Sequence, residues 1–225
     1  AVERLYVVAP IYEEFLAELA KQMDRIAVGT GDNRDIGPII FAPQLDIIET
    51  HVSDARAKGA LVLRGGRRAD TPSGIYYEPT LLTGVDHGMQ VMQEETFGPV
   101  LPVVRVADEA EALSMANDSM YGLHGSVWSK DKKRAERFAS QMETGTVAVN
   151  DVAVNFVVPT VSFAGIKNSG HDGVYGPEGI KAFCYPRSIT EARLPWATTR
   201  LLGAWYPRRR GMRYWKALAQ LLFRR

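Results

Sequence analysis

The sequence predicts an α/β fold, a sheet with helices on both faces, from three observations. Short apolar runs alternate with longer segments in which apolar residues recur at helical spacing, and this rhythm is typical of such folds. Gly59 separates a helical pattern from a following apolar run, as at the helix ends of αβ units. The composition, 46% hydrophobic and 24% charged residues in a chain of 225, is that of a globular protein and excludes disordered and low-complexity classes.

The first elements follow one another closely. Residues 5–8 form an apolar strand, and Pro10 then occupies the first turn of a helix. That helix repeats apolar residues at Ile11, Phe15, Leu16, Leu19 and Met23. A loop rich in Gly and Asp, residues 29–37, ends it. A second helix over 43–58 and a strand over 60–63 follow, and we expect them to form one αβ unit of a parallel sheet.

The later elements continue the pattern. We expect strands over 100–106, 125–128 and 146–150, and helices over 108–117 and 131–142, the second capped by Asp131. Residues 152–163 are apolar, include Pro159 and lack a helical period, so they predict a loop or an edge strand. Residues 188–194 predict a short strand outside the main layer, and 195–207 a linker.

Cysteine and histidine usage limits the chemistry. Cys184 is the one cysteine, so no internal disulfide or cysteine-based zinc site forms within the chain, and a reducing compartment is favoured. The four histidines, His51, His87, His124 and His171, show no short ligand spacing, and we predict no metal site. No apolar run reaches the roughly 18 residues that span a bilayer, and the N-terminus lacks a signal-peptide pattern. We therefore expect a cytoplasmic protein.

The charges are divided unevenly along the chain. No Asp or Glu follows Glu191, whereas nine of the 27 Lys and Arg residues do. Residues 1–192 therefore carry 18 basic and 26 acidic side chains, a net charge of −8, and the tail carries +9. The acidic body argues against a nucleic-acid partner, and the basic tail indicates an anionic one.

The tail also has an amphipathic pattern. On a helical wheel over 212–224, four polar residues share a narrow arc: Arg213, Lys216, Gln220 and Arg224. One hypothesis is attachment of residues 204–225 to an anionic membrane surface, aided by the aromatic residues Trp205 and Trp215. The alternative is a terminal helix packed on a partner subunit.

One stretch carries a specific motif. Residues 93–100 read Gln-Glu-Glu-Thr-Phe-Gly-Pro-Val, with two carboxylates and an aromatic residue directly before a buried strand. Sheet enzymes place their ligands at such positions. By contrast, residues 29–31 do not fit a dinucleotide fingerprint, and the Gly65-Gly66-Arg67-Arg68 stretch lacks the end of a phosphate loop and is interpreted as a basic turn.

Further segments of the chain, together with that motif, follow the order and spacing of one known protein family. They include Glu78-Pro79-Thr80, Tyr121-Gly122-Leu123, Gly145 to Asn150 and the Phe163 to Gly170 segment that holds Lys167-Asn168-Ser169-Gly170. Over residues 1–192 the chain resembles the C-terminal half of the NAD(P)-dependent aldehyde dehydrogenases. The resemblance implies that residues 1–187 are a catalytic-domain portion and that 188–194 form an oligomerisation strand in a homo-oligomer. Residues 195–225 lie beyond it, and their own pattern predicts a linker and a basic amphipathic helix.

The resemblance also implies residue roles. Glu95 would hold the hydroxyls of the nicotinamide ribose, and Phe97 would lie against the nicotinamide of NAD or NADP. Asn155, Phe156 and Phe163 would shape the substrate pocket for an aldehyde. Glu94 is interpreted as structural.

The residues that perform the family's chemistry are not found in this sequence. The nucleophilic cysteine should lie just before the strand at residues 2–8, so the chain resembles a portion that starts right after it, and Cys184 matches a late, non-catalytic position. We therefore predict no catalytic residue here and no activity of the chain alone. Two alternatives stay open: a non-catalytic truncated copy that acts as an oligomerisation or membrane-surface module, and a reductase of acyl phosphates or thioesters from the same superfamily.

Overall fold

The computed structural model describes residues 2–71, 74–170 and 173–191, together with residues 216 and 220. The chain divides into two units, Ala1–Phe183 and Cys184–Arg225. Within the described residues, all strands and helices lie in the first unit except the helical positions 216 and 220.

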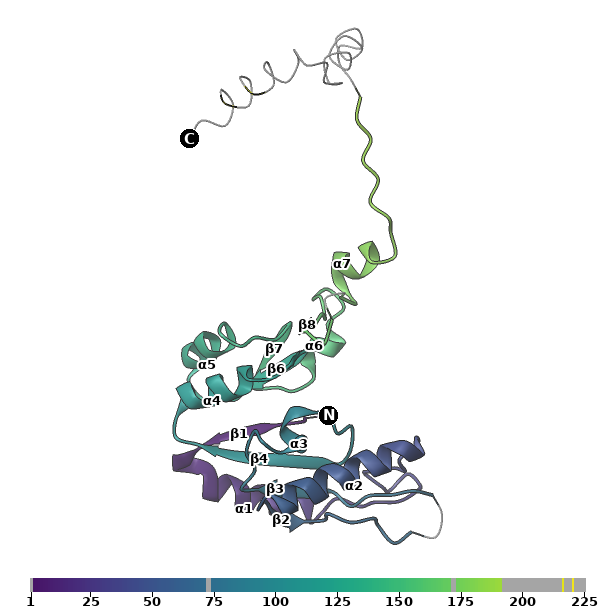
Figure 1. Cartoon of the computed structure of the whole chain (residues 1–225), viewed down its shortest axis with the longest axis vertical. Helices are drawn as coiled ribbons and strands as arrows, with labels where there is room; N and C mark the ends of the chain where they lie inside the picture. The colour runs from purple at the N-terminus through teal and green to yellow at the C-terminus, as the bar shows by residue number, and fades with distance from the viewer. Residues whose placement is uncertain (1, 72–73, 171–172, 192–215, 217–219, 221–225) are drawn as a thin grey trace. The chain divides into compact units, whose positions relative to one another are not determined.

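The first unit alternates strands and helices along the chain (Figure 1). Its strands are β1 (Leu5–Val8), β2 (Leu61–Arg64), β3 (Thr80–Thr83), β4 (Val100–Val106), β5 (Tyr121–Gly122), β6 (His124–Val127), β7 (Thr146–Val149) and β8 (Ile166–Lys167). Its helices are α1 (Tyr12–Met23), α2 (Ala42–Ala57), α3 (Gln90–Gln93), α4 (Glu109–Asn117), α5 (Lys132–Ala139), α6 (Val154–Val157) and α7 (Gly176–Lys181), with a 3-10 turn over Ala9–Ile11.

The larger sheet is mixed, with the strand order β1-β4-β3-β2. Strand β4 pairs in parallel with β1 and β3, whereas β2 pairs antiparallel with β3. The prediction that β2 belongs to a parallel αβ unit is therefore wrong. The described residues between β2 and β3, 65–71 and 74–79, form no helix, and a connection without a crossover returns the strand in the opposite direction.

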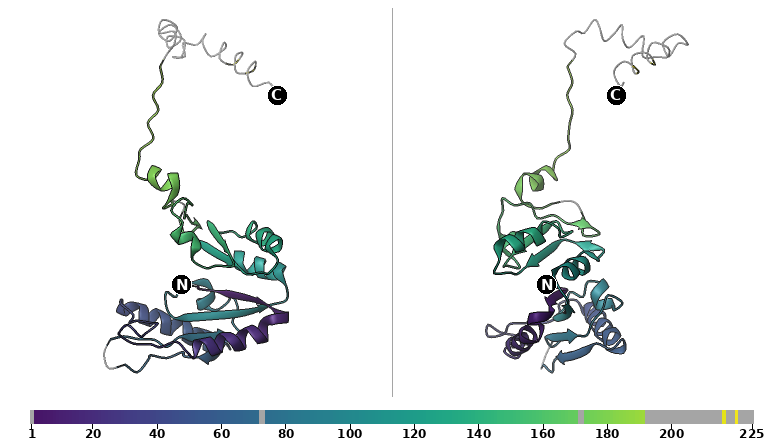
Figure 2. Two further views of the ribbon diagram at one scale, coloured as in Figure 1. Left: turned by 180° about the vertical axis from the view of Figure 1, so that it is seen from behind. Right: turned by 90° about the vertical axis from the view of Figure 1, so that its left-hand side faces the viewer.

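Helices cover both faces of this sheet, as expected. Leu81 and Val103 pack with Tyr12 of α1, while the next residues along the strands, Leu82 and Val104, pack against α2 on the other face. The alternation follows from the two-residue period of a strand. The side view in Figure 2 shows the strands between the two helices.

Aspartates begin two of the helices. The Asp108 carboxylate accepts the backbone N–H groups of Ala110 and Glu111 at 2.9 and 3.0 Å, and the Asp131 carboxylate accepts that of Arg134 at 3.0 Å. These bonds satisfy N–H groups that have no partner inside a helix. The predicted cap at Asp131 is confirmed.

The remaining strands form two small pairs, β5 with β8 antiparallel and β6 with β7 parallel. Strand β3 and helix α3 were not predicted. The expected loop or edge strand over 152–163 contains the single turn α6, because the Asp151 carboxylate accepts the N–H groups of Ala153 and Val154, both at 2.7 Å.

The predicted C-terminal elements lie largely outside the described residues. Residues 188–191 form no helix or strand in the single chain, and the strand predicted over 188–194 would pair with another subunit, so it stays a prediction. In the predicted amphipathic helix, Lys216 and Gln220 are described, and both are helical and exposed. No helix of the described residues is long and apolar enough to cross a bilayer.

Candidate functional site

The loop between α3 and β4 carries the motif found in the sequence. Glu94 ends α3, with its N–H bonded to Gln90 at 2.9 Å, and Val100 begins β4. At the far end, the Pro99 carbonyl accepts the N–H of Thr80 in β3 at 2.7 Å. The loop is thus fixed at both ends to the edge of the sheet.

Helix α2 holds the middle of this loop through Thr96, which is 1% exposed. The Thr96 hydroxyl lies 3.0 Å from His51 Nδ1, and the Thr96 carbonyl accepts the side-chain amide of Gln44 at 2.7 Å. His51 is itself buried, so the bond joins two groups that water does not reach.

Glu3, next to β1, holds the same loop from the other side. One oxygen of its carboxylate accepts the N–H of Thr96 at 3.0 Å, and the other accepts the N–H of Phe97 at 3.3 Å. Phe97 has a φ of +43°, which non-glycine residues rarely adopt, and 64% of it is exposed. The loop therefore presents the Phe97 ring to solvent instead of the core.

Gly98 allows the loop to approach α2 closely. A Cβ atom at this position would lie 2.6 Å from Cδ1 of Ile48, a fully buried side chain. Any larger residue would have to displace the loop or the helix.

A cavity of about 440 Å³ lies beside the loop. Residues of α2, α3, the motif and β5 line it: Gln44, Asp46, Ile47, Thr50, His51, Gln90, Glu94, Glu95, Phe97 and Tyr121. Both residues predicted to bind the cofactor, Glu95 and Phe97, are among them. The structure therefore brings an exposed carboxylate and an exposed aromatic ring to one cavity.

The two neighbouring glutamates differ in their surroundings. The Glu94 carboxylate lies 3.5 Å from Nε2 of His51, so it contacts the helix that holds the loop. Among the described residues, the Glu95 carboxylate has no hydrogen-bond or ion-pair partner. Glu95 is therefore available to accept hydrogen bonds from a ligand.

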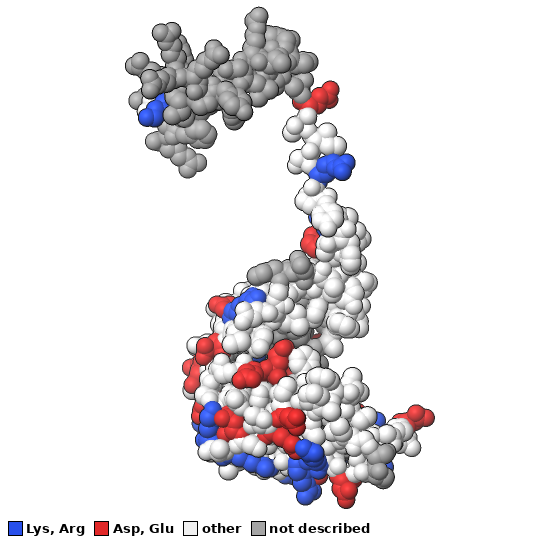
Figure 3. Space-filling view, turned by 45° about the vertical axis from the view of Figure 1, so that its right-hand side comes forward, with Lys and Arg blue, Asp and Glu red and all other residues white. Residues whose placement is uncertain are grey.

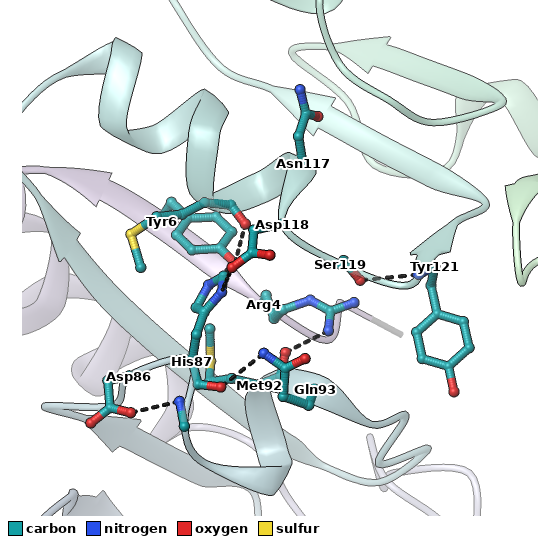
Figure 4. A network of polar contacts seen from close by, with 12 residues as sticks. Arg4, Tyr6, Asp86, His87, Met92, Gln93, Asn117, Asp118, Ser119 and Tyr121 are labelled. Carbon is teal, nitrogen blue, oxygen red and sulfur yellow. Dashed lines mark hydrogen bonds and ion pairs between the residues drawn. The ribbon is translucent and has the colours of Figure 1, made fainter.

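A network of polar contacts connects β1 to the segment that leads to Tyr121 (Figure 4). The Tyr6 hydroxyl lies 3.0 Å from Nε2 of His87, and Nδ1 of the same ring lies 2.9 Å from the Asp118 carboxylate. Ser119 follows, and its hydroxyl accepts the N–H of Tyr121 at 3.2 Å. Burial of Tyr6 raises its pKa to about 12. The network thus connects the segment that carries Tyr121, a lining residue of the cavity, to strand β1 at the edge of the larger sheet.

The residues predicted for the substrate pocket lie in another part of the first unit. The rings of Phe156 and Phe163 meet edge to face at 5.7 Å, and Phe156 contacts Tyr175 in the same way at 6.1 Å. Asn155 is partly buried in α6 beside them. The structure groups these three predicted residues with each other, and none of them lines the cavity of Glu95.

The arginines of the basic turn are paired with acids. Arg68 bonds Glu49 through two nitrogens at 2.7 Å, and Arg67 bonds Glu78 at 2.9 Å. Figure 3 shows basic and acidic side chains interspersed over the lower part of one face. Such pairing leaves little charge for a phosphate ligand and agrees with the interpretation of this stretch as a turn.

Sequence reasoning missed the supporting residues of the site. Glu3, Gln44 and His51 act through bonds to a loop that lies 45 to 94 residues away. The bond partner of Gln44, the Thr96 carbonyl, does not follow from any local sequence pattern. No sequence pattern around Glu3 or His51 indicated a role at this site.

Comparisons with known proteins identify the family. A model described as the aldehyde dehydrogenase family matches residues 1–189. The 4,4'-diapolycopene aldehyde oxidase of a Methylomonas species is 44% identical over 200 residues, which is 87% of this chain and 36% of that protein. The betaine aldehyde dehydrogenase of Bacillus subtilis is 38% identical over 81% of this chain and 38% of its own length.

Solved structures point to the same family. The betaine aldehyde dehydrogenase of Staphylococcus aureus, in a mutant form crystallised with NAD⁺, matches with a TM-score of 0.79 and 33% identity, over 85% of this chain and 41% of that one. The chain thus spans about two fifths of the length of the relatives it matches. It belongs to the aldehyde dehydrogenase family.

Proposed function

We propose that this chain is the C-terminal catalytic-domain portion of an NAD(P)-dependent aldehyde dehydrogenase, whose complete polypeptide oxidises an aldehyde to a carboxylic acid. The observation that carries the proposal is the shared cavity of Glu95 and Phe97. A carboxylate without a protein partner and a solvent-exposed ring are the groups that a ribose diol and a nicotinamide require.

The roles of the two residues follow from their chemistry. The Glu95 carboxylate would accept hydrogen bonds from both ribose hydroxyls, and such charge-assisted bonds are stronger than neutral ones. The Phe97 ring would lie against the nicotinamide and so fix which of its faces can accept hydride. Glu3 and α2 keep both residues in place through Thr96. The bound nicotinamide supplies the hydride acceptor.

The nucleophile is assigned to a part of the polypeptide outside these 225 residues. Formation of a thiohemiacetal needs a cysteine thiolate. Cys184, the one cysteine, is exposed and begins the second unit beyond α7, where the resemblance gives no catalytic role. The chain therefore contributes cofactor binding and part of the substrate pocket, through Asn155, Phe156 and Phe163.

The relatives support oxidation of an aldehyde over reduction of an acyl phosphate or thioester. The names of those reported above refer to an aldehyde oxidase and to aldehyde dehydrogenases. The relatives do not decide between NAD⁺ and NADP⁺ as the cofactor. A Mycolicibacterium smegmatis relative is named for NADP⁺, and the staphylococcal structure holds NAD⁺. We further propose that the complete enzyme is a homo-oligomer joined through residues 188–194.

The test is binding of nicotinamide mononucleotide, the ribose-nicotinamide half of the cofactor, to the 225-residue chain. Amide resonances of residues 93–98 report on the site. We expect saturable binding that Glu95→Gln weakens about tenfold, because a charged acceptor of two hydroxyls is lost. Glu14→Gln, the same change on the exposed face of α1, should leave the affinity unchanged.

Two results would overturn the proposal. One is the absence of saturable binding by the wild-type chain, which would favour the non-catalytic module. The other is equal affinity of the wild-type and Glu95→Gln chains, which would show that the carboxylate does not hold the ribose.

A further inference from the structure

The segment around α6 is uncharged and largely apolar at its surface. Residues 152–166 contain no Asp, Glu, Lys, Arg or His. Six apolar side chains of this segment and the chain opposite it are 40% to 72% exposed, and we call them the apolar surface: Val152, Val154, Phe156, Val157, Val161 and Val174. A contiguous patch of exposed apolar side chains marks a binding site more often than it forms part of the ordinary protein surface.

The apolar surface is held in shape by backbone and ring contacts. Phe163 and Val174 pair through two backbone hydrogen bonds, at 2.9 and 3.0 Å, and so join the two parts of the surface. The Asp151 carboxylate anchors the first turn of α6. Phe156 contacts Phe163 and Tyr175 edge to face. Phe156 is 58% exposed although its ring makes both contacts.

In the part of the chain that the structure describes, the charged groups next to the segment already have partners. The Asp151 carboxylate is bonded to two backbone N–H groups, and Lys167 lies 2.7 Å from the Glu143 carboxylate and 2.7 Å from the Asn117 carbonyl. Among the described residues, a substrate carboxylate placed on the apolar surface would lose water and gain no cation. A quaternary ammonium group would likewise find no unpaired carboxylate among them, and the ring of Phe156 meets those of Phe163 and Tyr175 edge to face instead of forming an open cage.

We propose that the substrate is an aldehyde with a long, uncharged hydrocarbon chain, and that this chain lies along the apolar surface. The inference rests on the proposed function and adds the substrate class. A hydrocarbon chain releases water from the valine side chains and from itself without leaving any polar group unpaired. Affinity should therefore grow with each methylene group.

The experiment uses primary alcohols as unreactive analogues of the aldehydes, so that lysines do not form adducts. Butan-1-ol, hexan-1-ol and octan-1-ol are titrated into the full chain while the amide resonances of residues 152–163 are followed. Burial of a methylene group stabilises a complex by about 0.8 kcal/mol, or about fourfold in affinity. We expect a gain approaching that factor per methylene. Choline and 4-hydroxybutanoate, analogues of the quaternary ammonium and carboxylate substrates, should bind no better than butan-1-ol.

Matched variants locate the binding. Val157→Glu places a charge on a side chain that is 72% exposed, and we expect it to weaken octan-1-ol binding about tenfold. Leu61→Glu makes the same kind of change on strand β2, at a residue 62% exposed, and should have no effect.

Three results would overturn the inference: affinities independent of chain length, equal binding by the Val157→Glu and Leu61→Glu chains, or loss of a dimer with Val157→Glu in sedimentation velocity, which would make the surface a subunit contact. Nicotinamide mononucleotide is titrated into the same samples. Its normal binding alongside a failed alcohol series would reject the substrate class and leave the proposed function standing, whereas its failure to bind would reject the proposed function itself.

Discussion

The carboxylate of Glu3 accepts the backbone N–H of Thr96 at 3.0 Å, across 93 residues of sequence. Through this bond the residues before β1 hold the loop that carries Glu95 and Phe97. The second oxygen of the same carboxylate accepts the N–H of Phe97, which has the unusual positive φ. One side chain thus ties the start of the chain to the conformation of the candidate site.

Replacing Glu3 should destabilise the fold and loosen the site together. A typical hydrogen bond contributes about 0.5–1.5 kcal/mol net, and the partly buried Glu3 carboxylate accepts two of them. We expect Glu3→Ala to lower the free energy of unfolding by about 2 kcal/mol in urea titrations, and Glu3→Gln, which keeps one acceptor, by about half of that. Glu14→Ala, on the exposed side of α1, serves as control. A Glu3→Ala chain as stable as this control would show that the two bonds contribute nothing.

Tyr6 should make the protein sensitive to alkali. Burial raises its pKa to about 12 from the ordinary value of 10.0, so the unfolded chain loses this proton first. The contribution to stability is then fully present below pH 10 and is lost as the pH rises toward 12. Tyr77 behaves in the same way, with a pKa raised to about 12 chiefly by burial.

Urea midpoints measured at several pH values above 9 test this expectation. They should fall more steeply for the wild-type chain than for Tyr6→Phe, in which only Tyr77 of the pair still titrates. At neutral pH, Tyr6→Phe should cost about 1 kcal/mol, because the bonds to His87 and to the Met115 carbonyl are lost. Identical pH slopes for the two chains would contradict the assignment.

Protonation of His124 should lower the stability of the protein at acidic pH. Its ring is partly buried beside Phe163, its Nδ1 lies 2.9 Å from the Thr146 hydroxyl, and among the described residues its buried Nε2 has no hydrogen-bond partner. Burial lowers the pKa of His124, an effect opposed by the nearby backbone of Val152 and the Asp151 carboxylate. The unfolded chain therefore takes up this proton at a higher pH than the folded one, and stability falls as the pH drops below about 6.5.

The comparison is between the wild-type chain and His124→Gln, which keeps a polar side chain and removes the titration. We expect the loss of stability between about pH 7.5 and about pH 5.5 to be smaller in the variant, as measured by urea unfolding. His171 lies outside the described residues, and His171→Gln controls for the loss of a histidine as such. A steeper loss in His124→Gln than in the wild-type chain would contradict the direction of the pKa shift.

Local signals in the sequence were sufficient to predict the elements that have a clear hydrophobic period or a capping residue. β1, β4 and α4 lie within a residue or so of the predicted ranges, because apolar runs and capping aspartates are encoded locally. β3 was missed, since its four residues, Thr-Leu-Leu-Thr, are too few to show a period and are buried on both faces. The direction of β2 depends on its connection to β3, which no local pattern contains.

The residues of the candidate site also divide into those that a local motif reveals and those that only tertiary contacts reveal. Glu95 and Phe97 belong to one contiguous motif, so a resemblance could find them. The partners of that motif, Glu3 and His51, come from distant segments, and they become visible when β1 and α2 pack on the two sides of the loop. The grouping of Phe156 with Phe163 and Tyr175 likewise arises from tertiary contacts.

The basic tail should bind anionic membranes. Residues 204–225 contain seven of the nine Lys and Arg residues that follow Glu191, with no acidic residue among them. Lys216 and Gln220 are both helical and exposed, and the rest of this segment lies outside the described residues. Each Lys or Arg near an anionic surface contributes about 1 kcal/mol at low salt.

We therefore expect the full chain to sediment with vesicles rich in phosphatidylserine and a chain that ends at residue 203 to stay in the supernatant. Neutral phosphatidylcholine vesicles are the control, and binding to the anionic vesicles should weaken as salt shortens the range of the attraction. Equal sedimentation of the two chains would exclude membrane attachment through the tail. If the full chain alone forms a larger assembly in sedimentation velocity without binding vesicles, the tail is instead a contact between subunits.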